Sequence, residues 1–115
     1  MITDRMRRIL KERDPYCLHC GDDVDLVVHH RQNRGMGGRG SSLDRFDNLM
    51  RVCQDYNFKM EASEVIAEDA RKFGHKLSSW QDFSEPVYDE CDGNWYALKD
   101  DGTKEVIEAP EQGMF

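Results

Sequence analysis

The sequence lacks any long hydrophobic segment, and this absence excludes whole classes of protein. No run of about eighteen apolar residues occurs, so we expect no transmembrane helix and no membrane partner. The basic start, with Arg5, Arg7 and Arg8, is not followed by the apolar segment that an export signal needs. Internal repeats and low-complexity tracts are missing as well. We therefore expect a cytoplasmic protein with one domain, or one small domain with an appendage.

Apolar residues are few and charged ones are many, and the charge is unevenly distributed. Hydrophobic residues make up 38% of the 115 positions and charged residues 34%, so the core must be modest and a metal ion would help to hold it. The net charge of −7 comes from residues 61–115, with 5 Lys and Arg against 14 Asp and Glu, whereas residues 1–60 have 11 against 9. A nucleic-acid site would therefore be local, unless the arginines of the central loop only solvate it. Those arginines are Arg31, Arg34, Arg39, Arg45 and Arg51.

The four cysteines favour a metal site over disulfides. Cys17-Leu-His-Cys20 has the two-residue gap of a zinc knuckle, in which both thiolates reach one tetrahedral ion. A second Cys-x-x-Cys is missing, because Cys53 is followed three residues later by Tyr56. The fourth cysteine, Cys91, lies far along the chain.

The first half of the chain alternates helical and extended patterns. Residues 3–13 have apolar residues at helical spacing, with Thr3 or Asp4 as the start of the helix, and Pro15 ends it. The apolar residues 26–28 predict a short strand that ends at His29 and His30. A loop rich in glycine and arginine follows. The further predicted elements are an apolar return at 46–52, a helix at about 52–61, and a second helix between a Ser63 cap and a Gly74 stop.

The second half predicts short strands. Residues 86–88, 95–98 and 105–107 carry strand-forming residues, and Asp100-Asp101-Gly102 is a good hairpin turn between the last two. We expect residues 77–110 to form a small antiparallel β appendage and residues 111–115 a frayed end. The fold class is therefore α+β.

The His29-His30 pair has the chemistry that phosphodiester hydrolysis requires. Neighbouring side chains on a strand point to opposite faces, so His29 can bind a divalent metal while His30 acts as general base. Asn57 would supply a second ligand through its amide oxygen. Asn48 would hydrogen-bond backbone across the loop and so fix His30. Taken singly, Asn48 can be an ordinary turn residue and Asn57 a solvated helix position.

The ordered set of these motifs resembles the HNH endonuclease family. Over roughly residues 14–75 the chain has Cys-x-x-Cys, a strand, His29-His30, a glycine-arginine loop, Asn48-Leu-Met-Arg-Val-Cys53 and then Asn57. The resemblance implies a ββα-metal core in which His29 and Asn57 bind the catalytic metal, His30 is the base and Asn48 positions it. His29-His30-Arg31-Gln-Asn-Arg34 and the later Phe73-Gly-His look like small HNH proteins of actinobacteria and their phages. We accordingly expect an HNH domain at 1–76 and an acidic, hairpin-containing extension at 77–115.

Two positions depart from the family pattern. Many relatives have a fourth cysteine where this chain has Tyr56, so Cys17, Cys20 and Cys53 either hold structural zinc, with water or Cys91 completing the site, or form a relic. Relatives often have a second metal-binding histidine where this chain has Glu61. As a third ligand, a carboxylate at this position would favour Mg²⁺ or Mn²⁺ over Zn²⁺, unless Glu61 is a solvated helix residue.

The resemblance predicts a metal-dependent DNA endonuclease of low sequence specificity, encoded by a phage and acting in the host cytoplasm. Arg31 or Arg34 would bind the scissile phosphate, and DNA would be cut on one or both strands. The alternative is a catalytically degenerate HNH-fold module that binds DNA or protein. Such a module could serve phage DNA packaging in contact with terminase, a role that is also compatible with nuclease activity.

Overall fold

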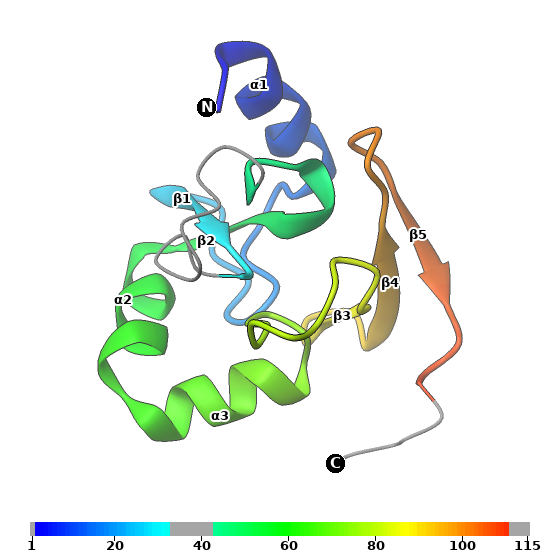
Figure 1. Cartoon of the computed structure of the whole chain (residues 1–115). Coiled ribbons are helices and arrows are strands. Elements are labelled where there is room, and N and C mark those ends of the chain that lie inside the picture. Colours follow the sequence, from blue (N-terminus) through cyan, green and yellow to red (C-terminus); the bar gives the residue numbers. More distant parts are fainter. Residues whose placement is uncertain (1, 33–42, 111–115) are drawn as a thin grey trace.

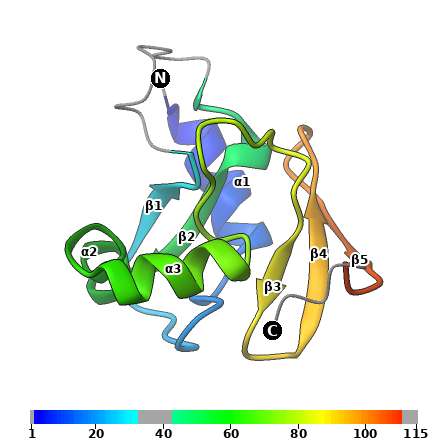
Figure 2. The ribbon, with the colours of Figure 1, turned by 60° about the horizontal axis from the view of Figure 1, so that its bottom comes forward.

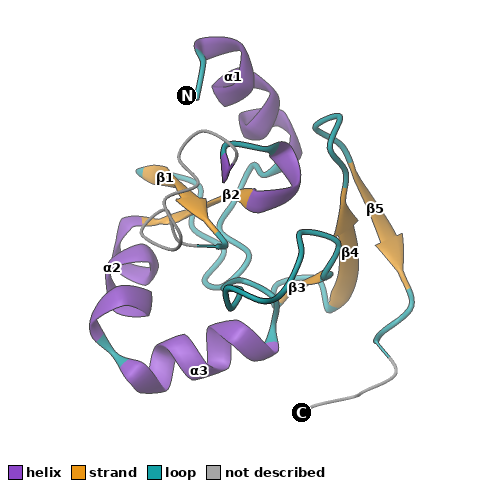
Figure 3. Cartoon of the chain, viewed as in Figure 1, coloured by secondary structure: helices purple, strands orange, loops and turns teal. Residues whose placement is uncertain are grey.

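The computed structural model describes residues 2–32 and 43–110. Within these ranges the chain forms three α-helices, a two-stranded antiparallel sheet and a three-stranded antiparallel sheet, which confirms the predicted α+β class (Figures 1 and 3). None of the helices in this part of the chain is long and apolar enough to cross a lipid bilayer.

The first helix, α1 (Asp4–Arg13), begins and ends where the sequence predicts. The Thr3 hydroxyl accepts a hydrogen bond of 3.1 Å from the backbone N–H of Met6, which caps the helix. Asp14 closes the last turn by donating its backbone N–H to the carbonyl of Leu10. Leu10 is fully buried and fixes the inner face of the helix.

Two short strands form the central hairpin, which positions both histidines. β1 (Leu26–His30) pairs antiparallel with β2 (Leu49–Cys53), and the 3₁₀ helix η2 (Phe46–Asn48) leads into β2. His29 lies opposite Met50, and His30 lies opposite Leu49. Strand alternation therefore directs the two imidazoles to opposite faces of the hairpin. Helix α1 contacts β2, and α2 contacts both strands; Figure 2 shows the hairpin between these helices.

Two consecutive helices follow the hairpin. α2 (Gln54–Ala62) begins two residues later than predicted, because Val52 and Cys53 still pair with β1 and Cys53 acts as the helix cap. α3 (Glu64–Lys72) is capped by Ser63, as predicted. The chain then turns at Gly74, whose φ is +76°. A β-carbon there would lie 1.9 Å from the carbonyl oxygen of Pro86, so only glycine fits this close approach.

The C-terminal half forms the predicted antiparallel strands, in the order β3-β4-β5. These strands are β3 (Val87–Asp89), β4 (Asn94–Leu98) and β5 (Lys104–Ile107). Val87 and Leu98 belong to the same buried cluster as Cys17, Met50 and Met60, so this sheet shares the core of the first half.

Arg31 is buried and cannot bind a phosphate, which corrects one sequence-based prediction. Its side chain is 0% exposed, and its guanidinium donates hydrogen bonds to four backbone carbonyls. The acceptors are Gly74 (2.8 Å), Asp47 (2.8 Å), Phe83 (3.3 Å) and Glu85 (2.5 Å). Burial lowers the pKa of Arg31 to about 9. Arg34, the other predicted phosphate ligand, lies outside the described residues.

Replacing Arg31 with methionine should destabilise the protein strongly. Methionine fills much of the space but donates no hydrogen bond, so four buried carbonyls would lose a donor. We expect a loss of roughly 3–5 kcal/mol in the free energy of unfolding, or failure to fold. Urea unfolding would measure the loss, with Arg5→Met on the exposed face of α1 as control. Equal stability of the two variants would contradict this account of Arg31.

Candidate functional site

His29 is buried between β1 and α2, and its two ring nitrogens have different partners. His29 is only 4% exposed. Nε2 lies 2.7 Å from the backbone carbonyl of His75, and because a carbonyl only accepts, Nε2 carries the proton. Burial lowers the pKa of His29 to about 4, so the imidazole is neutral at physiological pH. Nδ1 therefore presents a lone pair.

The lone pair of His29 faces the side chain of Asn57. The Asn57 Oδ1 atom lies 3.2 Å from His29 Nδ1. Two acceptor atoms repel each other at this distance unless a cation binds both, or unless the amide turns so that its NH₂ group donates to Nδ1. The predicted ligand pair, one on the hairpin and one on the first two turns of α2, is therefore brought together.

His30 lies on the other face of the hairpin, with Asp44 as its partner. His30 Nε2 is 2.7 Å from Asp44 Oδ1, and the His30 side chain is 14% exposed. Burial alone would raise the pKa of Asp44. The hydrogen bond from His30 is among the contacts that outweigh burial, so the pKa of Asp44 lies below its ordinary value. An ionised Asp44 accepts from Nε2–H, which leaves His30 Nδ1 as the basic nitrogen.

Asn48 joins the two ends of the segment between the strands. Its Oδ1 atom accepts from the backbone N–H of Gln32 (2.8 Å), and its Nδ2 donates to the carbonyl of Leu43 (2.9 Å). The side chain is fully buried. These are the backbone contacts that the sequence predicts, and they fix the chain directly after His30. The catalytic relevance of Asn48 stays a prediction.

Glu61 lies one turn after Asn57 and pairs with Lys76. The Lys76 Nζ atom is 3.3 Å from Glu61 Oε2. Both charges act on His29, whose pKa the lysine lowers and the carboxylate raises. Glu61 is thus close enough to influence His29 electrostatically, and its role as a metal ligand stays a prediction.

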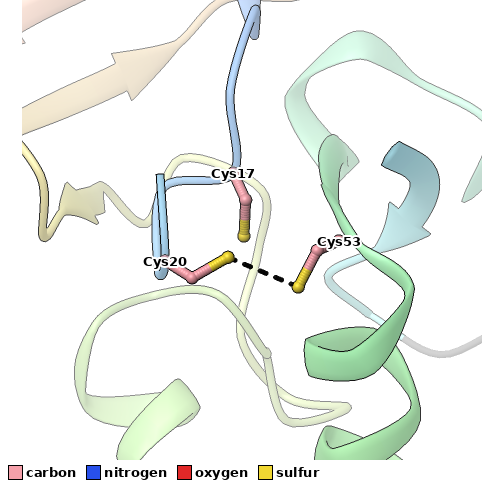
Figure 4. Close-up of side chains that lie close together, drawn as sticks. All are labelled: Cys17, Cys20 and Cys53. Atoms are coloured by element: carbon pink, nitrogen blue, oxygen red, sulfur yellow. Dashed lines mark hydrogen bonds between the residues drawn. The ribbon is translucent and has the colours of Figure 1, made fainter. Parts of the chain in front are cut away.

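Three of the four cysteines converge on one point. The Sγ atoms of Cys17, Cys20 and Cys53 lie within 4.8 Å of one another, so they can bind a metal ion (Figure 4). The Cys20 and Cys53 sulfurs are 3.5 Å apart. Cys91 is not part of this cluster: its sulfur lies 3.6 Å from the carbonyl oxygen of Cys17.

Tyr56, at the position of the missing cysteine, connects the cysteine cluster with the histidine site. Its backbone N–H donates to Cys53 Sγ, and its hydroxyl lies 2.7 Å from His75 Nδ1. The His75 Nε2 atom is 2.7 Å from the carbonyl of Tyr88, so Nε2–H donates there and Nδ1 accepts from Tyr56. His75 in turn supplies the backbone carbonyl that fixes the tautomer of His29.

Asp44, Tyr56 and His75 are the site residues for which the sequence offered no functional role. Asp44 lies fourteen residues from His30, and no short motif relates the two. His75 was visible within Phe73-Gly74-His75, but its burial depends on α3 and β3. Tyr56 was visible only as a departure from a cysteine pattern.

Comparison of the chain with known protein families, curated proteins and solved structures found no match.

Acid should destabilise the folded protein below pH 6.5, through His29 and His75. Burial lowers the pKa of His29 to about 4 and that of His75 to about 3, against an ordinary value of 6.5. Between these values the unfolded chain binds protons that the folded chain does not, so stability is full above pH 6.5 and falls as the pH decreases. Each histidine should contribute about 1.4 kcal/mol per pH unit within the window.

Urea unfolding at a series of pH values, with chelator present to remove metal effects, would measure this slope. His29→Gln should remove about half of the histidine contribution to the slope, whereas Val65→Ala, at an exposed and uncharged position of α3, should leave the slope unchanged. A stability that is flat just below pH 6.5 would show that these histidines are not buried in their neutral form.

Proposed function

We propose that this chain is a metal-dependent DNA endonuclease with a ββα-metal core of the HNH type. The observation that carries the proposal is the fixed lone pair of His29 Nδ1, which faces Asn57 Oδ1 at 3.2 Å. The hairpin β1–β2 followed by α2 supports the assignment, because α2 contacts both strands and supplies Asn57.

The donor atoms fit a small hard cation. Two neighbouring ligand atoms of an octahedral Mg²⁺ ion, each at 2.0–2.1 Å, are about 3 Å apart, close to the separation observed here. The Asn57 amide oxygen suits Mg²⁺ or Mn²⁺, and so does the Glu61 carboxylate, which would be the third protein ligand. When bound, the cation would neutralise charge that develops on the phosphate and on the leaving 3′-oxygen.

His30 would act as the general base. Asp44 holds its Nε2–H, so the His30 Nδ1 atom takes a proton from the attacking water, and the carboxylate stabilises the imidazolium that results. The oxygen of that water attacks phosphorus, the P–O3′ bond breaks, and the leaving 3′-oxygen takes a proton from solvent water. The products are a 5′-phosphate and a 3′-hydroxyl. Asn48 positions this step by holding the backbone beyond His30.

The second candidate is a degenerate HNH-fold module that binds DNA or protein without turnover. The ion pair between Lys76 and Glu61 favours it, because the lysine places a positive charge close to His29. A phage origin and contact with terminase, possible for either function, stay predictions.

Plasmid cleavage with Mg²⁺ or Mn²⁺ tests the proposed activity. His30→Ala should slow cleavage about 10²–10⁴-fold, since it removes the base. Asp44→Asn should slow it less, because His30 stays in place while the imidazolium loses its counter-charge. Asn57→Ala should raise the metal concentration needed, whereas Asn57→His, which keeps a ligand atom, should retain activity.

Val65→Ala is the matched control, because this exposed side chain of α3 takes no part in the site, and it should cleave like the unaltered protein. Absence of cleavage by the unaltered protein with either metal would exclude the nuclease. Metal binding that persists in both His29→Ala and Asn57→Ala would exclude these two residues as the metal ligands.

We further propose that the cysteine cluster binds Zn²⁺. A tetrahedral zinc ion with Zn–S bonds of 2.3 Å holds its sulfurs about 3.8 Å apart, which agrees with the observed cluster. The purified protein should contain one zinc ion, and removing it should cost roughly 2–4 kcal/mol of stability.

The chain supplies its own control for this proposal. Cys20→Ser should lose zinc and stability, whereas Cys91→Ser, outside the cluster, should keep both. Elemental analysis together with thermal unfolding, each with and without chelator, measures the two effects. Equal zinc content in Cys20→Ser and Cys91→Ser would rule out the cluster as the zinc site.

A further inference from the structure

A cleft lined by basic and apolar side chains lies between α1 and β1. Its volume is about 460 Å³. The apolar part of its lining from β1 is residues 26–28, and the cations are Arg7 and Lys11 of α1 and Arg51 of β2. No carboxylate side chain is among the described residues that line it. This concentration of positive charge stands out in a chain whose net charge is −7.

The three cations are available to a ligand. Arg7 and Lys11 are one helical turn apart, about 6 Å along the axis, so they project from the same side of α1. Both residues are exposed, and neither forms an ion pair with a carboxylate in the described part of the chain. The Arg51 Nη1 atom donates to the carbonyl of Asp14 (2.8 Å), which holds this guanidinium at the cleft. Other arginines are less free: Arg45 pairs with Asp47 and Asp100.

The cleft leads toward His30. Leu26, Val28 and His30 alternate along β1, so they lie on one face of the hairpin, and Arg51 lies opposite Val28 on the same face. Val28, which lines the cleft, and His30, the proposed base, are two residues apart on β1, which corresponds to about 7 Å along the strand. An anionic polymer bound in the cleft would therefore extend to the side of the hairpin that carries His30.

We propose that this cleft binds the sugar-phosphate backbone of the DNA that the His30 site cuts. The choice of DNA depends on the proposed function, and the cleft itself supplies the complementarity. Its cations match phosphates, and its apolar lining matches the C–H face of deoxyribose. Contacts of this kind fix the register of a duplex without reading its sequence. Arg51 belongs to the set of arginines that the sequence predicts for a nucleic-acid site, whereas Arg7 and Lys11 of α1 do not.

Binding of a short fluorescent DNA duplex in chelator, followed by anisotropy over a series of salt concentrations, tests the cleft without any cleavage. Arg7→Gln/Lys11→Gln should weaken binding at least about tenfold near physiological salt. It should also reduce the slope of log K against log salt by about 2, because two phosphates would no longer be neutralised. Arg5→Gln/Arg8→Gln is the matched control, because it removes the same charge from the same helix but does not alter the cleft lining.

The outcomes separate this inference from the proposed activity. If no variant cuts plasmid but only Arg7→Gln/Lys11→Gln loses DNA binding, the nuclease is wrong and the cleft stands. If the unaltered protein does not bind the duplex even at low salt, the cleft is wrong. Equal losses in both double variants would also overturn it. Competition gives a further test. If polyglutamate displaces the duplex as effectively as unlabelled DNA of equal charge, the cleft suits an acidic protein segment and the proposal is wrong.

Discussion

The buried guanidinium of Arg31 is the contact on which the placement of the other elements depends. A charge in a protein interior is costly unless hydrogen bonds replace its hydration. Here the replacement comes from carbonyls of η2, of the turn after α3, and of the segment before β3. All three segments must be in place before the charge is satisfied. Gly74, one of the acceptors, directly precedes His75, so the same contact positions the carbonyl that orients His29.

The two neighbouring histidines acquire different properties because a strand directs them to different surroundings. His29 faces α2, where burial keeps it neutral and a carbonyl fixes its proton on Nε2. His30 faces the other way, where it is partly accessible and has a carboxylate partner. A metal ligand needs an available lone pair, which the surroundings of His29 supply. A general base needs access to water and a fixed tautomer, which the exposure of His30 and its bond to Asp44 supply. The proposed division of labour thus follows from one residue of strand register.

Local patterns in the sequence predicted most of the elements, and distant contacts were not predictable. Thr3, Ser63 and Gly74 marked helix ends correctly, because caps and turns are set by neighbouring residues. The continuous apolar run through Val52 did not mark where strand becomes helix, so α2 was placed two residues early.

The candidate site was predictable to a similar extent. The approach of Asn57 to His29 followed from the order of the motifs. The burial of Arg31 did not, because its four acceptors lie between 16 and 54 residues away and an arginine beside a glycine-rich loop normally faces solvent. Asp44 and Tyr56 were missed for the same reason, since their partners become neighbours only in the folded chain.

Tyr56 belongs to both candidate sites, which makes the first turn of α2 a shared support. Its backbone N–H contacts the sulfur of Cys53, and its hydroxyl, through His75, stabilises the residue whose carbonyl holds His29. Free energies of substitutions add only when the residues share no partner. Changes at Cys53 and at His29 should therefore couple energetically, so that a substitution in one site alters the free-energy cost of a substitution in the other.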